Sequence, residues 1–204
     1  MTNVERRNVA PRTSNDERRR TRHLWLQGLQ LGRPGGLGIL PCVDATPYLV
    51  EIGRRLHEFR LDAVLIGNAA AALQGAPVTT VDFDFMFRKT RRNMQKLKAL
   101  ARALGATVLR PYYPAADLYR VVRGDGLQLD FMATIHGIRS FEGLRDRAQT
   151  VVVEDTSIRV ASLPDIIKSK KAARRPRDLA VIDVLEKALE ERTRQEEQAR
   201  RARP

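Results

Sequence analysis

VTTVDFDFMF, residues 78–87, has the alternation expected of a strand that is buried on one face. Residues i and i+2 of a strand point to the same face, so Asp82 and Asp84 project together while Phe83 and Phe85 project to the other side. Burying an ionised carboxylate is costly unless a cation or hydrogen-bond donors pair with it. The two aspartates therefore predict a bound cation beside a buried strand.

A glycine turn precedes this strand. The mainly apolar run 61–66 predicts a strand, and it ends at Gly67 and Asn68, which open a helix of small residues over 68–73. Turns of this kind present backbone N–H groups to anions such as phosphate. A phosphate-binding turn followed by two carboxylates predicts metal-assisted phosphoryl or nucleotidyl transfer.

A third acid, Asp130, lies in the alternating segment LQLDF, residues 127–131. If this strand lies beside the first, three carboxylates converge, and such a cluster of oxygen ligands favours Mg²⁺ or Mn²⁺. Asp130 is then the general base or the ligand nearest the attacking hydroxyl. The alternative is that Asp82 or Asp130 simply pairs with an arginine.

The composition indicates one globular domain with mobile ends, since 43% of the 204 residues are hydrophobic. The single cysteine, Cys42, is interpreted as a packing residue. No apolar run approaches the roughly 20 residues that span a bilayer, and the first residues do not resemble a secretory signal. We therefore expect a soluble, cytoplasmic protein without a membrane partner.

The net charge of +13 predicts attraction to polyanions, RNA especially. The alternative is that the arginine-rich ends reflect only a composition bias and solvation. The charge therefore suggests the class of partner without identifying it.

The predicted fold class is α/β (α+β), a small mixed sheet with packed helices and a C-terminal helical extension. Helices are expected at 47–60, capped by Asp44 or Thr46, from Thr90 to Gly105, and at 140–147, 163–174 and 177–199. Strands are expected at 61–66, 81–87, 107–110, 118–123, 127–133, 151–153 and 158–160. The expected regions are a basic arm and Gly/Pro linker over 1–40, a core over 41–162 and C-terminal helices over 163–204.

Residues 62–86 resemble the signature of the nucleotidyltransferase superfamily related to DNA polymerase beta: an apolar strand, a glycine turn, a small helix and an Asp-x-Asp strand with a later third acid. The chain is most similar to the abortive-infection and toxin–antitoxin group, of the AbiEii type. That group has a glycine, a proline and a threonine before the acids, and Gly75, Pro77 and Thr80 stand at those places. The resemblance covers roughly residues 45–190.

The resemblance implies roles for single residues. Asp82, Asp84 and Asp130 would be catalytic and hold Mg²⁺ or Mn²⁺, and Gly67 and Asn68 would bind nucleotide phosphates. Lys168, Lys171 and Arg174 would meet the triphosphate or the acceptor. The sequence departs from the family at Asn68, where Gly or Ser is usual, and at Val78, where an arginine is common. Either the triphosphate affinity is reduced, or the basic role passes to Lys168.

Together these features predict transfer of a nucleoside monophosphate from an NTP such as ATP to a hydroxyl, with RNA or a tRNA end as acceptor. The chain would act as a toxin with an antitoxin protein as partner. Two alternatives stay open: a nucleotidyltransferase that modifies a small molecule of the aminoglycoside type, and a catalytically inactive RNA-binding or regulatory module.

Overall fold

The computed structural model describes residues 45–80, 82–109 and 117–202. The predicted N-terminal arm, Cys42 and Asp44 lie outside these residues. Residues 46–202 carry all the helices and strands discussed below.

One seven-stranded sheet forms the centre of the fold, in the order β3-β4-β5-β2-β1-β7-β6. The pairs β2–β5 and β1–β7 are parallel and the other neighbours are antiparallel, which confirms the predicted mixed sheet. The strands are β1 (Ala63–Ile66), β2 (Phe83–Phe87), β3 (Thr107–Leu109), β4 (Leu118–Val122), β5 (Gln128–Met132), β6 (Gln149–Val153) and β7 (Thr156–Val160).

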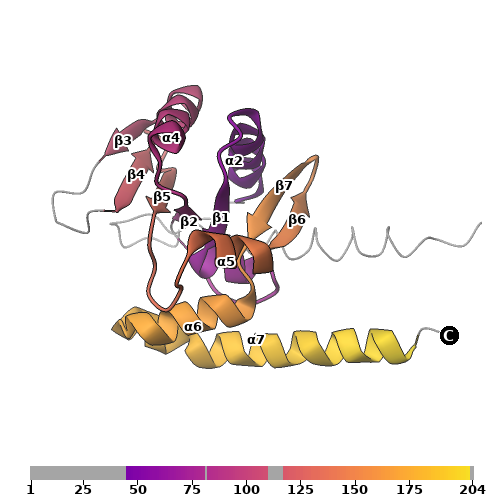
Figure 1. Ribbon diagram of the computed structural model, residues 1–204. Coiled ribbons are helices and arrows are strands. Elements are labelled where there is room, and N and C mark those ends of the chain that lie inside the picture. Colours follow the sequence, from indigo (N-terminus) through magenta and orange to yellow (C-terminus); the bar gives the residue numbers. More distant parts are fainter. Residues whose placement is uncertain (1–44, 81, 110–116, 203–204) are drawn as a thin grey trace, which may run out of the picture.

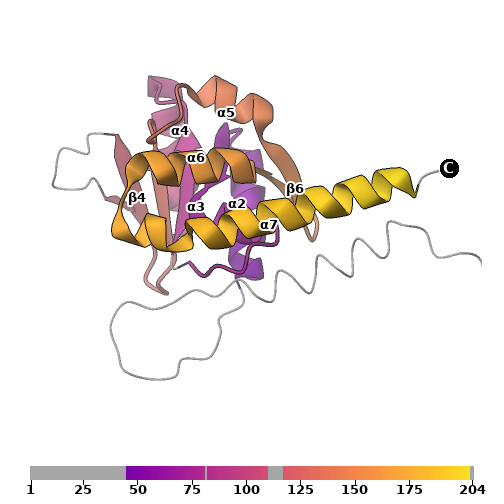
Figure 2. The same cartoon turned by 90° about the horizontal axis from the view of Figure 1, so that it is seen from below.

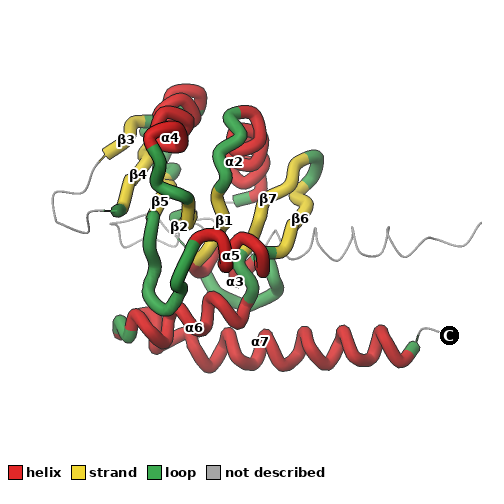
Figure 3. Tube along the Cα trace, in the orientation of Figure 1, coloured by secondary structure: helices red, strands yellow, loops and turns green. Residues whose placement is uncertain are grey.

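The helices lie around this sheet (Figure 1). They are α2 (Thr46–Glu58), α3 (Gly67–Ala72), α4 (Arg91–Ala103), α5 (Phe141–Arg147), α6 (Leu163–Ala173) and α7 (Pro176–Arg201). Figure 3 shows α2 and α4 at one side of the fold and α6 and α7 at the opposite side. Figure 2 shows α7 running past the rest of the fold towards the C-terminus, as the predicted helical extension requires.

The core forms because the apolar face of β2 is aromatic. Phe83, Phe85 and Phe87 are fully buried, and the ring of Phe85 stacks on that of Phe131 from β5 with centroids 5.1 Å apart. Phe87 meets Phe131 edge to face at 5.8 Å, a geometry that adds to the burial energy. The aspartates that alternate with these rings consequently lie on the other face of the sheet.

Side-chain caps explain the starts of three described helices, α4, α5 and α6. Thr90 accepts a hydrogen bond from the Asn93 amide and caps α4, as predicted, and Ser162 caps α6 through the Asp165 amide. The prediction for α2 is wrong at its first residue. Thr46 lies inside the helix and Ala45 occupies the cap position without a side-chain bond, while Pro47 fixes the first turn.

The described helices include none that is both long and apolar enough to cross a membrane. The longest of them, α7, carries charged side chains along most of its length.

Candidate active site

Three aspartates meet at one place on the sheet. Asp82 directly precedes β2, Asp84 lies within β2, and Asp130 lies within the parallel neighbour β5, paired in register with Asp84. One carboxylate oxygen from each lies within 4.8 Å of the others. The structure therefore brings together the three acids that the sequence singled out.

Asp84 is the least compensated member of the cluster. Burial, followed by the charges of Asp82 and Asp130, raises the pKa of the Asp84 carboxyl to about 7. Within the described part of the chain, no group donates a hydrogen bond to this carboxylate. Among the described residues this carboxylate has no ion-pair partner, and Lys170 and Arg177 act on it only electrostatically.

Asp82 is held by polar neighbours. Thr80 Oγ1 lies 2.8 Å from the carbonyl oxygen of Asp82 and 3.3 Å from Oδ1 of the same residue. Gln128 Nε2 donates to Oδ2 of Asp82 at 3.2 Å. Burial and then the Asp130 charge raise the pKa of Asp82, whereas the Thr80 hydrogen bond and the charges of Arg120 and Arg177 oppose that rise. These contacts orient Asp82 without neutralising it.

Asp130 is paired with an arginine, as the alternative interpretation of the sequence had it. Arg120 Nε donates to Oδ1 at 2.8 Å and Nη2 donates to Oδ2 at 2.7 Å, a bidentate geometry. Asp130 is 4% exposed, so Arg120 compensates a carboxylate that is almost completely buried. Each carboxylate oxygen has a second lone pair, so the arginine leaves acceptor capacity on Asp130.

The glycine turn closes on the same cluster. Gly67 has a φ of +70° at the end of β1, and a β-carbon there would lie 2.5 Å from Asp84 Oδ2. Asn68 Nδ2 donates to the Thr79 carbonyl at 3.0 Å, which ties α3 to the segment before β2. The side-chain donor of Asn68 is thus used within the protein, and its Oδ1 is buried without a partner among the described residues.

The further cations that act on the acids, besides Arg120, differ from those the resemblance implied. Lys170 and Arg177 oppose the rise in the pKa of Asp84. Lys170 is buried in an ion pair with Asp178, at 3.0 Å, where α6 meets α7. Among the cations expected from the sequence, Lys171 pairs with Glu186, and Arg174 ends α6 in the left-handed conformation.

Lys168 lines a pocket between α5 and α6. Residues two positions apart on a helix point about 160° away from each other, so Lys168 and Lys170 extend from nearly opposite sides of α6. Val78, at the position where the resemblance implied an arginine, is buried in the core. The roles of Lys168, Lys171 and Arg174 stay predictions.

Sequence reasoning missed Arg120, Gln128, Lys170 and Arg177. A signal existed for Arg120: the hairpin turn at 124–126 joins β4 to β5, and the resulting register places Arg120 opposite Asp130. Gln128 lies two residues before Asp130 on the same face of β5. Lys170 and Arg177 depend on how α6 and α7 pack, which the local sequence does not encode.

The donor set fits a divalent metal ion. Three carboxylates share one location, the Asp84 carboxylate lacks a donor among the described residues, and the neighbouring turn leaves room only for glycine. Oxygen-only ligands suit Mg²⁺ or Mn²⁺ better than softer ions. Asp82, Asp84 and Asp130 are therefore the residues that would hold the ion.

The mixed sheet, the glycine turn and the carboxylates on two parallel strands define a nucleotidyltransferase-like fold. A family model described as "Nucleotidyl transferase of unknown function (DUF2204)" matches residues 46–202, and the chain belongs to this family. This confirms the predicted superfamily and the enzyme class, whereas the likeness to the AbiEii type stays a prediction. A comparison with curated proteins found no significant match.

Solved structures agree with the fold. ANT(2")-Ia in complex with adenylyl-2"-tobramycin has a TM-score of 0.53 and 16% identity, covering 72% of this chain and 90% of that chain. The lincosamide antibiotic adenylyltransferase LnuA, lincomycin-bound, has a TM-score of 0.52 and 12% identity, covering 71% of this chain and 96% of that chain. At these identities the likeness concerns the fold.

Proposed function

We propose that this chain transfers a nucleoside monophosphate from an NTP to a hydroxyl of an RNA acceptor, at a divalent metal site formed by Asp82, Asp84 and Asp130. The observation that carries the proposal is the convergence of three carboxylates within 4.8 Å, one of which has no donor of its own among the described residues. A metal ion bound there would neutralise triphosphate charge and favour ionisation of the attacking hydroxyl.

The reaction is an in-line displacement. The acceptor oxygen forms a bond to the α-phosphorus, the bond from that phosphorus to the bridging oxygen breaks, and pyrophosphate leaves. Asp130 takes the proton of the acceptor hydroxyl, and the two hydrogen bonds from Arg120 orient Asp130 for that role. Positioning and charge neutralisation supply most of the acceleration in such reactions.

Positive groups near the acids suit the triphosphate. Lys170 and Arg177 act electrostatically on Asp84, and Arg177 makes no ion pair in the part of the chain that the structure describes. The turn at Gly67 and Asn68 supplies backbone N–H groups beside Asp84. We assign the α-phosphate to this turn and the leaving pyrophosphate to Arg177.

RNA is favoured as acceptor by the net charge of +13. The fold likeness to enzymes solved with a tobramycin adduct and with lincomycin supports a small-molecule acceptor as the second candidate. A cationic drug would be repelled by a basic surface, so we rank it second. The proposed toxin role adds an antitoxin partner, which growth arrest on expression and its relief by a neighbouring gene would test.

The test incubates the protein with each α-labelled NTP and Mg²⁺, and with total RNA or an aminoglycoside as acceptor in separate reactions. Label should enter RNA with wild-type protein and be lost with Asp82→Ala. The matched control is Asp155→Ala, which removes an exposed aspartate in the β6–β7 turn and should leave transfer unchanged. Label that appears only on an aminoglycoside would replace RNA by the second candidate. RNA binding without any transfer, unaffected by metal or by Asp82→Ala, would indicate an inactive binding module.

A further inference from the structure

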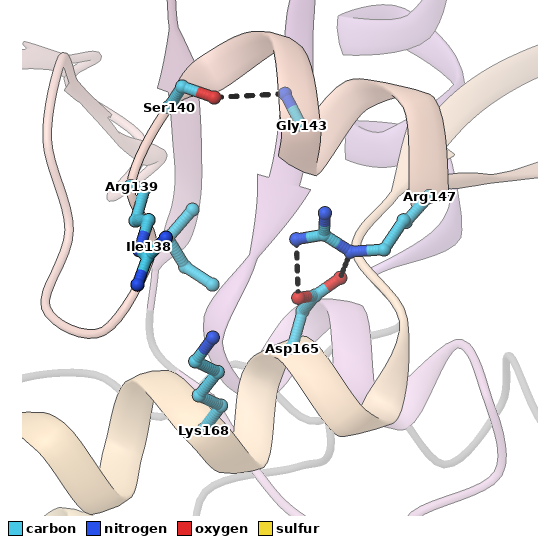
Figure 4. A pocket seen from close by; sticks show the side chains of 7 residues that line it. All are labelled: Ile138, Arg139, Ser140, Gly143, Arg147, Asp165 and Lys168. Carbon is cyan, nitrogen blue, oxygen red and sulfur yellow. Dashed lines mark hydrogen bonds and ion pairs between the residues drawn. The ribbon is translucent and has the colours of Figure 1, made fainter.

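A second polar site lies between α5 and α6, in a pocket of about 250 Å³ (Figure 4). Figure 4 shows Arg139 and Lys168 at one side, the Arg147–Asp165 pair at the other, and Ser140 and Gly143 along the first turn of α5. Three cations and one acid therefore surround the opening.

The acid is already neutralised. Arg147 Nε and Nη2 donate to the two oxygens of Asp165 at 3.0 and 2.8 Å, and Ser162 Oγ donates to Oδ2 at 2.9 Å. Asp165 is 7% exposed, so its charge is committed to these partners. The pocket keeps a net positive charge from the remaining two cations.

Arg139 and Lys168 are both exposed, and neither makes an ion pair or hydrogen bond among the residues that the structure describes. Many other arginines in this fold are paired with a carboxylate. Two unpaired cations that face one small opening repel each other, and an anion between them would relieve that repulsion.

The loop that carries Arg139 is fixed against α6. Gly137 has a φ of +74°, and a β-carbon there would lie 2.9 Å from Ala172 Cβ and 3.0 Å from the Lys168 carbonyl oxygen. The loop backbone at Gly137 is in direct contact with α6. Arg139 and Lys168 therefore extend from two segments that pack against each other. The backbone contact thus fixes the relative positions of the two residues that supply the cations.

The pocket is separate from the three aspartates. Lys168 and Lys170 extend from nearly opposite sides of α6, and of the two only Lys170 acts on Asp84. The volume is below the roughly 300–1,000 Å³ of sites that enclose a drug-sized molecule. It suits one phosphate group whose remaining chain continues into solvent.

We infer that this pocket binds a backbone phosphate of the RNA acceptor, with Arg139 and Lys168 as the ligands. The inference rests on the proposed function for its choice of RNA. Two phosphate oxygens would accept charge-assisted hydrogen bonds from the guanidinium and the ammonium group. Such bonds fix the register of the acceptor without reading its sequence.

The test measures binding of a fluorescein-labelled single-stranded oligoribonucleotide by anisotropy, in EDTA and without NTP, over a salt series. The double variant Arg139→Gln with Lys168→Gln should bind about 10- to 100-fold more weakly, as expected when bonds to charged groups are removed. Its salt dependence should be shallower, by about 0.7 in log–log slope for each phosphate of a single strand that is no longer neutralised. Unchanged affinity and slope would overturn the inference.

The matched control is Lys98→Gln with Arg102→Gln, which removes two exposed cations of α4 that lack partners in the described structure. An equal loss of RNA affinity in this control would also overturn the inference. Mg²⁺–ATP binding, followed by equilibrium dialysis, should be the same in the Arg139/Lys168 variant as in wild type. Parallel loss of ATP binding would assign the pocket to the nucleotide instead.

This measurement is independent of catalysis. Asp84→Ala should abolish transfer and keep the binding, so failure of the proposed chemistry leaves the pocket testable. Failure of RNA binding at the pocket would leave nucleotidyl transfer to another hydroxyl intact. Neither the Arg139 nor the Lys168 side chain makes a hydrogen bond or ion pair among the described residues, so thermal unfolding of the double variant should match that of wild type.

Discussion

Gly67 lies directly against Asp84, and a β-carbon at residue 67 would stand 2.5 Å from Asp84 Oδ2. Gly67 also has a φ of +70°, in the left-handed region that disfavours other residues. Glycine is therefore required at residue 67 for two reasons. Its backbone adopts a left-handed conformation, and a side chain there would overlap the Asp84 carboxylate. The first requirement concerns stability and the second concerns the acid cluster.

Gly67→Ala should reduce nucleotidyl transfer by about 100-fold or more, because displacement of a reacting group by about 1 Å has effects of that size. The added methyl group must push Asp84 away from Asp82 and Asp130. Initial rates of labelled NMP transfer at saturating NTP measure the effect.

Gly105→Ala is the matched control, since Gly105 has a φ of +63° and a β-carbon added there would meet no atom within 4 Å. Both substitutions should cost about 1–2 kcal/mol in the free energy of unfolding for the left-handed backbone. Activity should fall only in Gly67→Ala. Equal activity in both variants would show that the Gly67–Asp84 contact is not needed.

Asp84 makes the metal-free protein less stable as pH rises. Its folded pKa of about 7 lies above the ordinary value of 3.8, so between these values the folded chain holds a proton that the unfolded chain has released. The free energy of unfolding should therefore fall as pH rises from about 4 to about 7, by at most about 4 kcal/mol. Urea unfolding in EDTA across this range measures the slope.

Two comparisons isolate the cause. Saturating Mg²⁺ should remove most of the decline, because the ion replaces the proton as the compensating charge. Asp84→Asn should flatten the profile in EDTA, because the amide does not ionise. A decline that persists in this variant would assign the effect to other carboxylates.

Arg120→Gln should affect stability and metal affinity in opposite directions. Loss of the guanidinium leaves the buried Asp130 with only the long hydrogen bond from Gln128 Nε2, at 3.5 Å, which should cost about 1–3 kcal/mol of unfolding free energy in EDTA. The cluster also becomes more negative, so Mn²⁺ should bind about tenfold more tightly, a change of about 1.4 kcal/mol that is reasonable for one charge at this range. Calorimetric titration with Mn²⁺ and urea unfolding measure the two effects.

Arg54→Gln provides the comparison, because it removes an arginine from the exposed Arg54–Asp155 pair. It should change neither quantity. Weaker Mn²⁺ binding in Arg120→Gln would mean that Arg120 holds Asp130 in the ligating position, and that the two cations do not compete.

The acid cluster could be predicted from the sequence because its determinants are local. Alternation with Phe83 and Phe85 places Asp82 and Asp84 on one face, and the same rule orients Asp130 in β5. The parallel β2–β5 pairing then aligns Asp84 with Asp130. From the sequence this alignment could only be assumed, since no local rule states which strands become neighbours.

The cationic part of the site was harder to predict because it depends on helix packing. Lys168, Lys170 and Lys171 are nearly equivalent as a sequence run, yet they enter a pocket, a buried ion pair and an exposed ion pair, respectively. Only the packing of α6 against α3 and α7 gives these three lysines different environments. The resemblance to the family implied a role for Lys168 at the site, whereas it is Lys170 that the helix packing brings towards the acids.

Lys170→Met tests the buried ion pair at the junction of α6 and α7. Lys170 and Asp178 are each 9% exposed, so the substitution leaves a buried carboxylate with only its longer contact to Arg175 Nε, at 3.5 Å, and should cost up to about 3–5 kcal/mol in the free energy of unfolding. Lys171→Met is the matched control and should cost about 0–1 kcal/mol, because its pair with Glu186 is exposed. Urea unfolding measures both.

The double variant Lys170→Met with Asp178→Asn separates the ion pair from the fold. Removing both charges should recover much of the lost stability, since the poorly compensated carboxylate is then gone. Nucleotidyl transfer should be low in Lys170→Met and in the double variant alike, because both lack the positive charge that acts on Asp84. Recovery of activity together with stability would show that Lys170 serves only to hold α6 against α7.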